Sequence, residues 1–353
     1  MATISEYLKL RRLVDILYDV QDVRMRTANR LRVFPKEARE VHVKPLLEEE
    51  KNLTEEIQLM LGDIPICQLY LGHVKGIGPR IAGMIISQTM IKFVEVDGAE
   101  FRKMAKIVEE DVPLVDVPYN KQQVQLAIKT KGGNYKIPTI RGIGAFDTVS
   151  KYWEWWGVGM VKIDGKWCPQ KKWGVKSFEK QFGRKPTVEE LKINYNPKMK
   201  TLVWKTGNQF IKIHGGHRDI YDHFHDKYAA TRIRLVEEEG KDDRWVPTGT
   251  CPQWDACKAK LTKALKPTCA GHVVGMSMRA TVKFFIADLW EFWRRMEGLP
   301  VREPYVLEKM GHTTRLKSPL LEKYKVKDEP PEEGEEEENK GEEGEEEGDE
   351  EEE

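Results

Sequence analysis

The sequence has no long uninterrupted run of apolar residues, and this absence sets the first limit on what the protein does. Its longest apolar runs fall well short of the ~20 residues that cross a bilayer. The first residues, Met1–Glu6, lack the features of a signal peptide. We therefore expect a cytoplasmic protein without membrane contact. Cysteine is scarce as well, since five residues, an odd number, argue against a disulfide framework.

The motifs of several enzyme classes are also missing. We find no Walker phosphate loop, no strand-coupled dinucleotide fingerprint, no HExxH pair and no Ser-His-Asp arrangement. The acidic residues outside the C-terminal tail form no recognisable nuclease cluster. The composition is nevertheless that of a globular protein: 353 residues, of which 40% are hydrophobic and 9% aromatic, suffice for a sizeable core and two or three domains.

The net charge of zero hides two regions of opposite sign. Residues 328–353 hold 18 Asp and Glu against one Lys, a charge of −17, so residues 1–327 carry +17. Such asymmetry points to a nucleic-acid partner, with a merely lysine-rich soluble protein as the plainer alternative. We expect the tail to be disordered, because polyglutamate with glycine has nothing to bury. It would compete with DNA for the basic body.

Helical periodicity predicts a mainly α-helical fold. Helices are predicted over residues 4–32, from Pro45 onward, around 148–156, across 198–236 and over 273–297. The first two would form an antiparallel pair that packs in the core or serves as a homodimer interface. A small β-hairpin is expected with Asp164-Gly165 at its turn. Residues 166–197 read as a basic, loop-rich insertion, and a weak strand signal covers 112–117.

The most informative short motif is Gly76-Ile77-Gly78-Pro79-Arg80-Ile81-Ala82. Its glycines permit a tight turn, and Pro79 suits the first position of the following helix. The N–H groups at such a helix start bind phosphate without reading a base, and Lys75 and Arg80 add positive charge. The pattern is similar to the hairpin of helix-hairpin-helix DNA-binding modules; an ordinary helix–helix turn is the alternative.

A second Gly-Ile-Gly, Gly142 to Gly144, follows Arg141. It would form a second hairpin that pairs with the first, or a structural turn, and the acidic Asp147 nearby favours the turn.

Four potential zinc ligands cluster in the C-terminal third: Cys251, Cys257, Cys269 and His272. Three thiolates and an imidazole complete a tetrahedral structural Zn²⁺ site. This site would hold the start of the last predicted helix. Reduced buried cysteines are the alternative, as is an iron–sulfur or redox site. Cys67 and Cys168 stand alone and are expected to be core or surface thiols.

Several stretches, taken in order, resemble one family. They are the hairpin block His73–Ile86, the aromatic block Phe146–Gly159, the block Trp204–Lys212 and the closing helix over 273–297. Together they resemble the C-terminal domain of the bridge-RNA-guided insertion-sequence transposases, which pair a RuvC-like DEDD nuclease domain with a helix-hairpin-helix domain. The resemblance divides the chain into an N-terminal helical pair (1–62), a transposase-like domain (63–325) with insertions at 98–140, 162–196 and 229–268, and an acidic tail (326–353).

The resemblance implies a DNA-binding protein of a mobile genetic element that acts on duplex or branched DNA. About 62 residues before the hairpin block are too few for a RuvC-like domain. Ser177, the only serine between the second and third blocks, does not stand in the family's motif. We therefore leave catalytic residues unassigned and do not expect nuclease activity from this chain alone. The alternatives are a recombinase with a separate catalytic subunit, or a non-enzymatic RNA-binding protein that uses tryptophan stacking. The predicted DNA-binding residues are Lys75, Gly76, Ile77, Gly78, Arg80, Arg141, Lys205 and Asn208.

Overall fold

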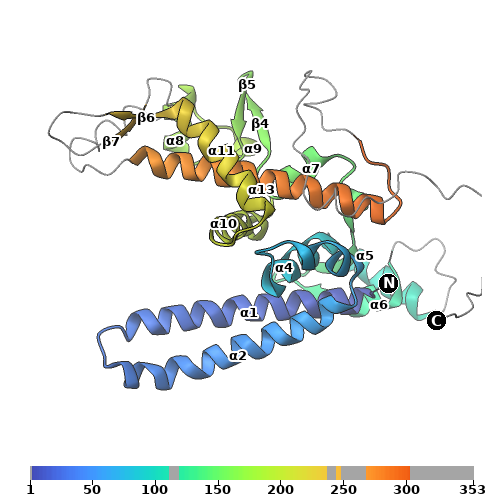
Figure 1. Cartoon of the computed structure of the whole chain (residues 1–353). Coiled ribbons are helices and arrows are strands. Elements are labelled where there is room, and N and C mark those ends of the chain that lie inside the picture. The colour runs from blue at the N-terminus through green and yellow to red at the C-terminus, as the bar shows by residue number, and fades with distance from the viewer. Residues whose placement is uncertain (1, 111–118, 237–243, 248–267, 303–353) are drawn as a thin grey trace, which may run out of the picture.

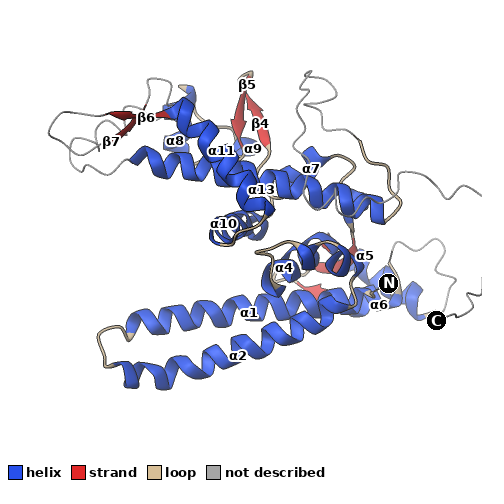
Figure 2. Ribbon diagram, viewed as in Figure 1, coloured by secondary structure: helices blue, strands red, loops and turns tan. Residues whose placement is uncertain are grey.

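The computed structural model describes residues 2–110, 119–236, 244–247 and 268–302. Figure 2 shows that this part of the chain is mainly helical, with a few short antiparallel strands, which confirms the prediction of a mainly α-helical fold. None of the described helices is both long and apolar enough to cross a membrane. The acidic tail lies outside the described residues.

Two long helices, α1 (Ile4–Arg30) and α2 (Lys36–Gly62), form the predicted antiparallel N-terminal pair (Figure 1). Thr3 begins α1 with a capping box, in which its hydroxyl accepts from the Glu6 N–H. The prediction that α2 starts at Pro45 is wrong, because α2 begins at Lys36 and includes the proline. The preceding Lys, Glu, Ala and Arg residues are strong helix formers and continue the helix through it.

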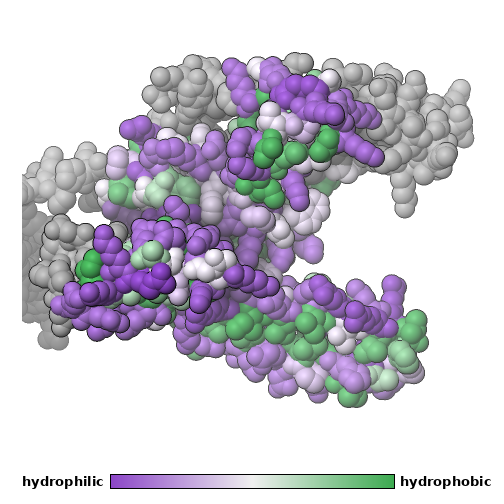
Figure 3. Space-filling view, turned by 180° about the vertical axis from the view of Figure 1, so that it is seen from behind, coloured by the Kyte–Doolittle hydropathy of each residue, from purple (hydrophilic) through white to green (hydrophobic). Residues whose placement is uncertain are grey.

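The helical pair carries exposed apolar side chains. They are Ile16, Val23, Met25, Val33, Phe34, Val41, Leu47 and Leu59. Figure 3 shows hydrophobic surface along this arm of the molecule. The predicted homodimer, which stays a prediction, would bury these side chains.

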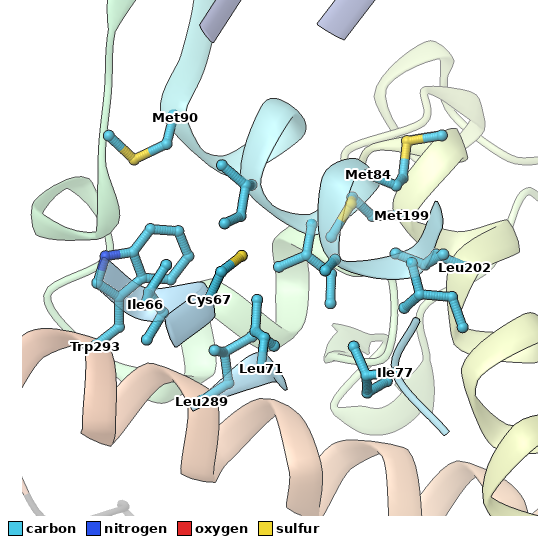
Figure 4. Packing of buried hydrophobic residues seen from close by; sticks show 14 of the residues in the cluster. Ile66, Cys67, Leu71, Ile77, Met84, Met90, Met199, Leu202, Leu289 and Trp293 are labelled. Carbon is cyan, nitrogen blue, oxygen red and sulfur yellow. The ribbon is translucent and has the colours of Figure 1, made fainter. Parts of the chain in front are cut away.

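Helix α4 (Pro79–Met90) lies at the centre of the molecule, preceded by α3 (Pro65–Leu69) and the 3-10 turn η1 (Leu71–His73). It begins at Pro79, as predicted. Every residue of α4 from Ile81 to Met90 is buried, because α1 and α2 cover one side and α10 another. Figure 4 shows Met84 of α4 near Met199 and Leu202 of α10, and Ile66 and Cys67 of α3 near Trp293 of the last helix.

A small sheet with its own hydrophobic cluster follows α4. Strands β1 (Ile91–Val96), β3 (Tyr135–Ile140) and β2 (Ile128–Lys129) pair antiparallel in the order β1-β3-β2. Helices α5 (Gly98–Glu109) and α6 (Lys121–Gln125) pack against it through Met104, Val108 and Val124. The strand signal at 112–117 lies outside the described residues.

Helix α7 (Val149–Trp155) forms where predicted and leads into the hairpin of β4 (Met160–Ile163) and β5 (Lys166–Pro169). Asp164 and Gly165 both have positive φ, 48° and 77°, as the expected tight turn requires. The insertion over 166–197, predicted to be loop-rich, keeps long loops but has more regular structure than expected. It contains α8 (Val175–Phe182) and α9 (Val188–Leu191), which close a core of Ile163, Cys168, Trp173 and Phe178.

The C-terminal half is built around one long helix. Helices α10 (Pro197–Lys212) and α11 (Gly216–Arg232) are followed by the strand pair β6 (Ile233–Val236) and β7 (Arg244–Pro247), and then by α13 (Thr268–Met296). Helix α13 starts five residues before the predicted position and ends before Gly298, as predicted. Its buried stripe, which includes Phe285, Leu289 and Trp293, joins α3, α7 and α10 in one core.

The contact between α10 and α13 depends on Gly207. A Cβ atom at this position would lie 2.1 Å from Cγ of Met278, so we expect Gly207→Ala to destabilise the protein by about 1–3 kcal/mol through overpacking. Urea unfolding measures the change, and a second substitution, Met278→Ala, should recover part of it. Gly275→Ala, in an open position on α13, is the control and should not destabilise. Equal effects at 207 and 275 would contradict the close packing.

Candidate nucleic-acid interface

A groove of about 850 Å³ lies between the start of α4, the side of α1–α2 and the outer face of α10. We call it the cationic groove. Apolar residues and glycines form part of its lining. The polar and charged residues that line it are Tyr18, Gln21, Thr54, Lys75, Arg80, Lys205, Asn208, Gln209 and Lys212. Four of these side chains are cationic, and within the described part of the chain no carboxylate lines the groove. The groove therefore attracts anions.

The loop of the predicted hairpin forms one wall of this groove. Gly76 has a φ of 97°, a conformation that favours glycine, and an added Cβ would lie 3.3 Å from Cβ of Gln209 in α10. Ile77 is 8% exposed and anchors the loop in the core. Its side chain is therefore largely buried, although Ile77 is one of the residues that line the groove.

Gly78 and the following residues direct free backbone donors into the groove. Gly78 is the N-cap of α4, and nothing lies within 4 Å of the place where its Cβ would be. In the part of the chain that the structure describes, the N–H groups of Gly78 and Arg80 have no backbone acceptor. Pro79 has no N–H at all. The groove thus meets the positive end of a 12-residue helix with two unpaired N–H groups.

Arg80 is held in place from behind the groove. Its Nε donates to the Thr54 hydroxyl at 3.1 Å, and its Nη1 lies 3.4 Å from Oε2 of Glu50. Glu50 is only 2% exposed and also binds Arg24 of α1. One buried carboxylate thus links α1, α2 and α4, while the Arg80 side chain stays 39% exposed toward the groove. Glu50 carries no signal in sequence that would single it out from its neighbours Glu48 and Glu49.

The α10 side of the groove contributes Lys205 and Asn208. Lys205 Nζ lies 3.7 Å from the Tyr18 ring centroid, a cation–π contact. Burial and the nearby Arg80 charge lower the pKa of Lys205. An anion in the groove would offset that repulsion. Asn208 donates one amide N–H to the Trp204 carbonyl at 2.8 Å, and its amide carries a second N–H donor.

The structure therefore gathers seven of the eight predicted binding residues around one groove: Lys75, Gly76, Ile77, Gly78, Arg80, Lys205 and Asn208. The eighth, Arg141, which was predicted beside a second hairpin, lies outside this groove and makes contacts within the fold. Its Nε donates to the Thr89 carbonyl at 3.1 Å, and the guanidinium lies 4.1 Å from the Trp155 ring centroid. Burial lowers the pKa of Arg141 to about 10. This arginine ties β3 to α4 and α7.

The second Gly-Ile-Gly forms a structural turn. Gly142 has a φ of 64° and precedes a 3-10 turn, η3 (Ile143–Ala145), in which Ile143 is fully buried. The segment does not line the cationic groove. Of the two alternatives, a second hairpin or a structural turn, the structure therefore shows the turn at Gly142 to Gly144.

The predicted zinc site falls largely outside the described residues. Cys251 and Cys257 lie in a segment that the structure does not describe. Cys269 and His272 lie in the first turns of helix α13. Within the described residues no group of three or more His, Cys, Asp and Glu could hold a metal ion. The zinc prediction thus stays a prediction. Cys67 and Cys168 are both buried, and burial raises the pKa of Cys67 to about 12.

Three further residues at the groove were not singled out from the sequence. Trp204 is 59% exposed and lines the groove, as does Lys212 at the end of α10. Gly215 packs against the aliphatic part of the Lys75 side chain. A Cβ atom added at Gly215 would lie 3.0 Å from Cδ of Lys75. The prediction of continuous helix across 198–236 is wrong, because the helix breaks between Lys212 and Gly216 and the stretch ends in β6; the Gly215-Gly216 pair was the signal available in sequence for this break. Ser177 lies in α8, where its hydroxyl donates to the Gly174 carbonyl at 2.8 Å.

We compared the chain with protein families, curated proteins and solved structures. No family model matches the chain, and no curated protein or solved structure matches it either.

Proposed function

We propose that the protein binds the phosphate backbone of DNA in the cationic groove. The observation that carries this proposal is the convergence of a helix N-terminus and four cationic side chains, from separate parts of the sequence, on one groove. Among the described residues, two N–H groups of this helix start have no partner and no carboxylate lines the groove. A phosphate accepts hydrogen bonds from such N–H groups and from lysine and arginine together. These contacts read no base, so the binding is independent of sequence.

The basic body and the resemblance to insertion-sequence transposases support DNA of a mobile element, including branched DNA, as the target. The departure from the family at Ser177, which does not stand in the family's motif, is the reason to propose binding without nuclease activity of this chain alone. A recombinase activity would then come from a separate catalytic subunit.

Trp204 favours a second candidate, a partner with unpaired bases such as single-stranded RNA. An aromatic ring that is 59% exposed beside a cationic groove is the arrangement on which unpaired bases stack. Stacking contributes about 1–3 kcal/mol per base, so the substitution Trp204→Ala separates the candidates. It should weaken binding of single strands strongly and of blunt duplex little.

The proposal is tested by binding of the full chain to linear duplex, a four-way junction and structured RNA over a series of salt concentrations. For DNA we expect log K to fall linearly with log salt, with a slope that corresponds to about 4–8 neutralised phosphates. Fluorescence anisotropy measures both affinity and slope. Binding that is absent at low salt, or that does not respond to salt, would overturn the proposal, and tighter binding to RNA would select the second candidate.

A further inference from the structure

The insertion between α7 and α10 is a small folded unit with an unusual charge. Residues 160–196, which we call the lysine module, hold nine Lys and Arg against four Asp and Glu. The module has its own aromatic core, in which the Trp173 ring lies 5.5 Å from that of Phe178 and 5.4 Å from that of Phe182. Its hairpin extends above α13 in Figure 1. The basic side chains are thus displayed on a folded scaffold.

Helix α8 places its aromatic side chains on the buried face and its lysines on the exposed face. Phe178 and Phe182 are one helical turn apart and face the aromatic core. Lys176 and Lys180 are offset from Phe178 by two residues in either direction, about 200° around the helix, and both are exposed. Two lysines four residues apart repel each other and destabilise an isolated helix by about 0.2–0.5 kcal/mol. The helix has one carboxylate, Glu179, beside this pair, and no ion pair between it and either lysine is found among the described residues.

Most of the acidic groups in the module are already engaged. Arg184 binds Asp164 at 2.8 Å and Glu190 at 2.6 Å, which cross-links the β-turn to α9. Lys192 binds Glu189 at 2.5 Å. Six other lysines are exposed and, within the described residues, belong to no ion pair: Lys162, Lys171, Lys172, Lys176, Lys180 and Lys185. The internal ion pairs therefore leave an uncompensated positive surface.

We infer that the lysine module is a second contact surface for the phosphate backbone of the DNA that the cationic groove binds. Lysine is a strongly hydrated point charge on a flexible stem, which suits contact with a polyanion that repeats along its length. The inference rests on the proposed function, because it assigns the module to the same ligand.

The fold provides a fixed distance between the two surfaces. Helix α10 starts at Pro197, directly after the module, and carries Lys205 and Lys212 of the groove. At 1.5 Å per residue these side chains lie roughly 12–23 Å along α10 from its first residue. One turn of duplex is about 34 Å long. A duplex of a few turns is therefore longer than the distance from these groove lysines to the start of α10, where the module ends.

The experiment neutralises the module and compares it with an equal change of charge elsewhere. The module variant replaces four lysines by glutamine in the full chain: Lys171, Lys172, Lys176 and Lys180. The control variant replaces four other exposed lysines by glutamine, each of which already pairs with a carboxylate four residues away. They are Lys36, Lys51, Lys106 and Lys151. Both variants change the net charge by the same amount at exposed positions, and circular dichroism checks that both are folded.

Binding to a 30-base-pair duplex is measured over a salt series by fluorescence anisotropy. We expect the module variant to bind about tenfold more weakly at low salt. The slope of log K against log salt should also become less steep by about 2–3, since each phosphate contact contributes about 0.9 to it. The control variant should keep the wild-type slope.

The outcomes separate the two proposals. If the wild-type protein does not bind, the proposed function fails and the module inference falls with it. If the wild-type protein binds and the module variant matches the control, only the module inference is overturned. Tighter binding by the module variant would mean that these lysines hold the acidic tail of the same chain, which would also overturn it.

Discussion

Replacing Gly78 by valine is expected to weaken DNA binding about 100-fold while leaving the protein folded. Gly78 has φ −90° and ψ 178°, an extended conformation that valine adopts readily, and no atom lies within 4 Å of its missing Cβ. The new side chain would occupy the space through which a phosphate reaches the N–H groups of Gly78 and Arg80. A hydrogen bond to a charged acceptor contributes about 1.5–3 kcal/mol, so loss of this contact gives the expected factor.

The matched control is Gly62→Val, at the end of α2, where an added Cβ also meets nothing within 4 Å. Both variants should unfold at the wild-type temperature, and only the Gly78 variant should lose affinity in anisotropy titrations. If the two variants bind equally well, the hairpin is only a turn between helices and the groove does not hold a phosphate at α4.

Gly76 would be a poorer test, although it belongs to the same motif. Its φ of 97° and its contact with Gln209 mean that any side chain there strains the loop and displaces α10. A loss of binding would then report a misplaced loop as easily as a lost contact. The two glycines of the motif thus have different roles: Gly76 fits the loop against α10, and Gly78 keeps the helix start open.

Local sequence signals predicted the elements that depend on local interactions. The apolar stripe of α13, the start of α4 at Pro79 and the Asp164-Gly165 turn were all predictable, because the period of apolar residues and turn chemistry determine them. Pro45 misled the prediction of α2, since a proline favours a helix start but does not prevent a longer helix when strong helix formers precede it.

The tertiary contacts of the site were less accessible. An arginine beside a Gly-Ile-Gly looks the same in sequence whether it faces solvent, as Arg80 partly does, or donates to carbonyls and stacks on Trp155, as Arg141 does. Likewise, the sequence does not reveal that Glu50, and not Glu48 or Glu49, is the buried partner of two arginines. These distinctions depend on which helices pack together.

The packing behind the groove leads to a second large effect, on acid stability. His217, at the start of α11, is 5% exposed, and its ring stacks on Phe210 at a centroid distance of 4.4 Å. Within the described residues its Nε2 has no hydrogen-bond partner. Phe210 in turn lies 3.5 Å from the place of a Cβ on Gly76. The histidine therefore stabilises the support of the hairpin loop, and it does so in the neutral form.

Burial lowers the pKa of His217 to about 4, whereas an unfolded histidine titrates near 6.5. Between these values the unfolded chain binds the proton and the folded protein does not, so stability is complete above about pH 6.5 and falls as the pH decreases toward 4. The difference corresponds to about 3 kcal/mol, at roughly 1.4 kcal/mol per pH unit.

His217→Phe should remove this contribution, because phenylalanine keeps the stacking on Phe210 and does not titrate. Urea unfolding at pH 7 and pH 4 measures it: the stability of the variant relative to wild type should rise by about 3 kcal/mol on acidification. The same substitution at the exposed His223 should give no such change. Parallel acid profiles for the wild-type and His217 variants would show that His217 is protonated in the folded protein, and that the hairpin support does not depend on its neutral form.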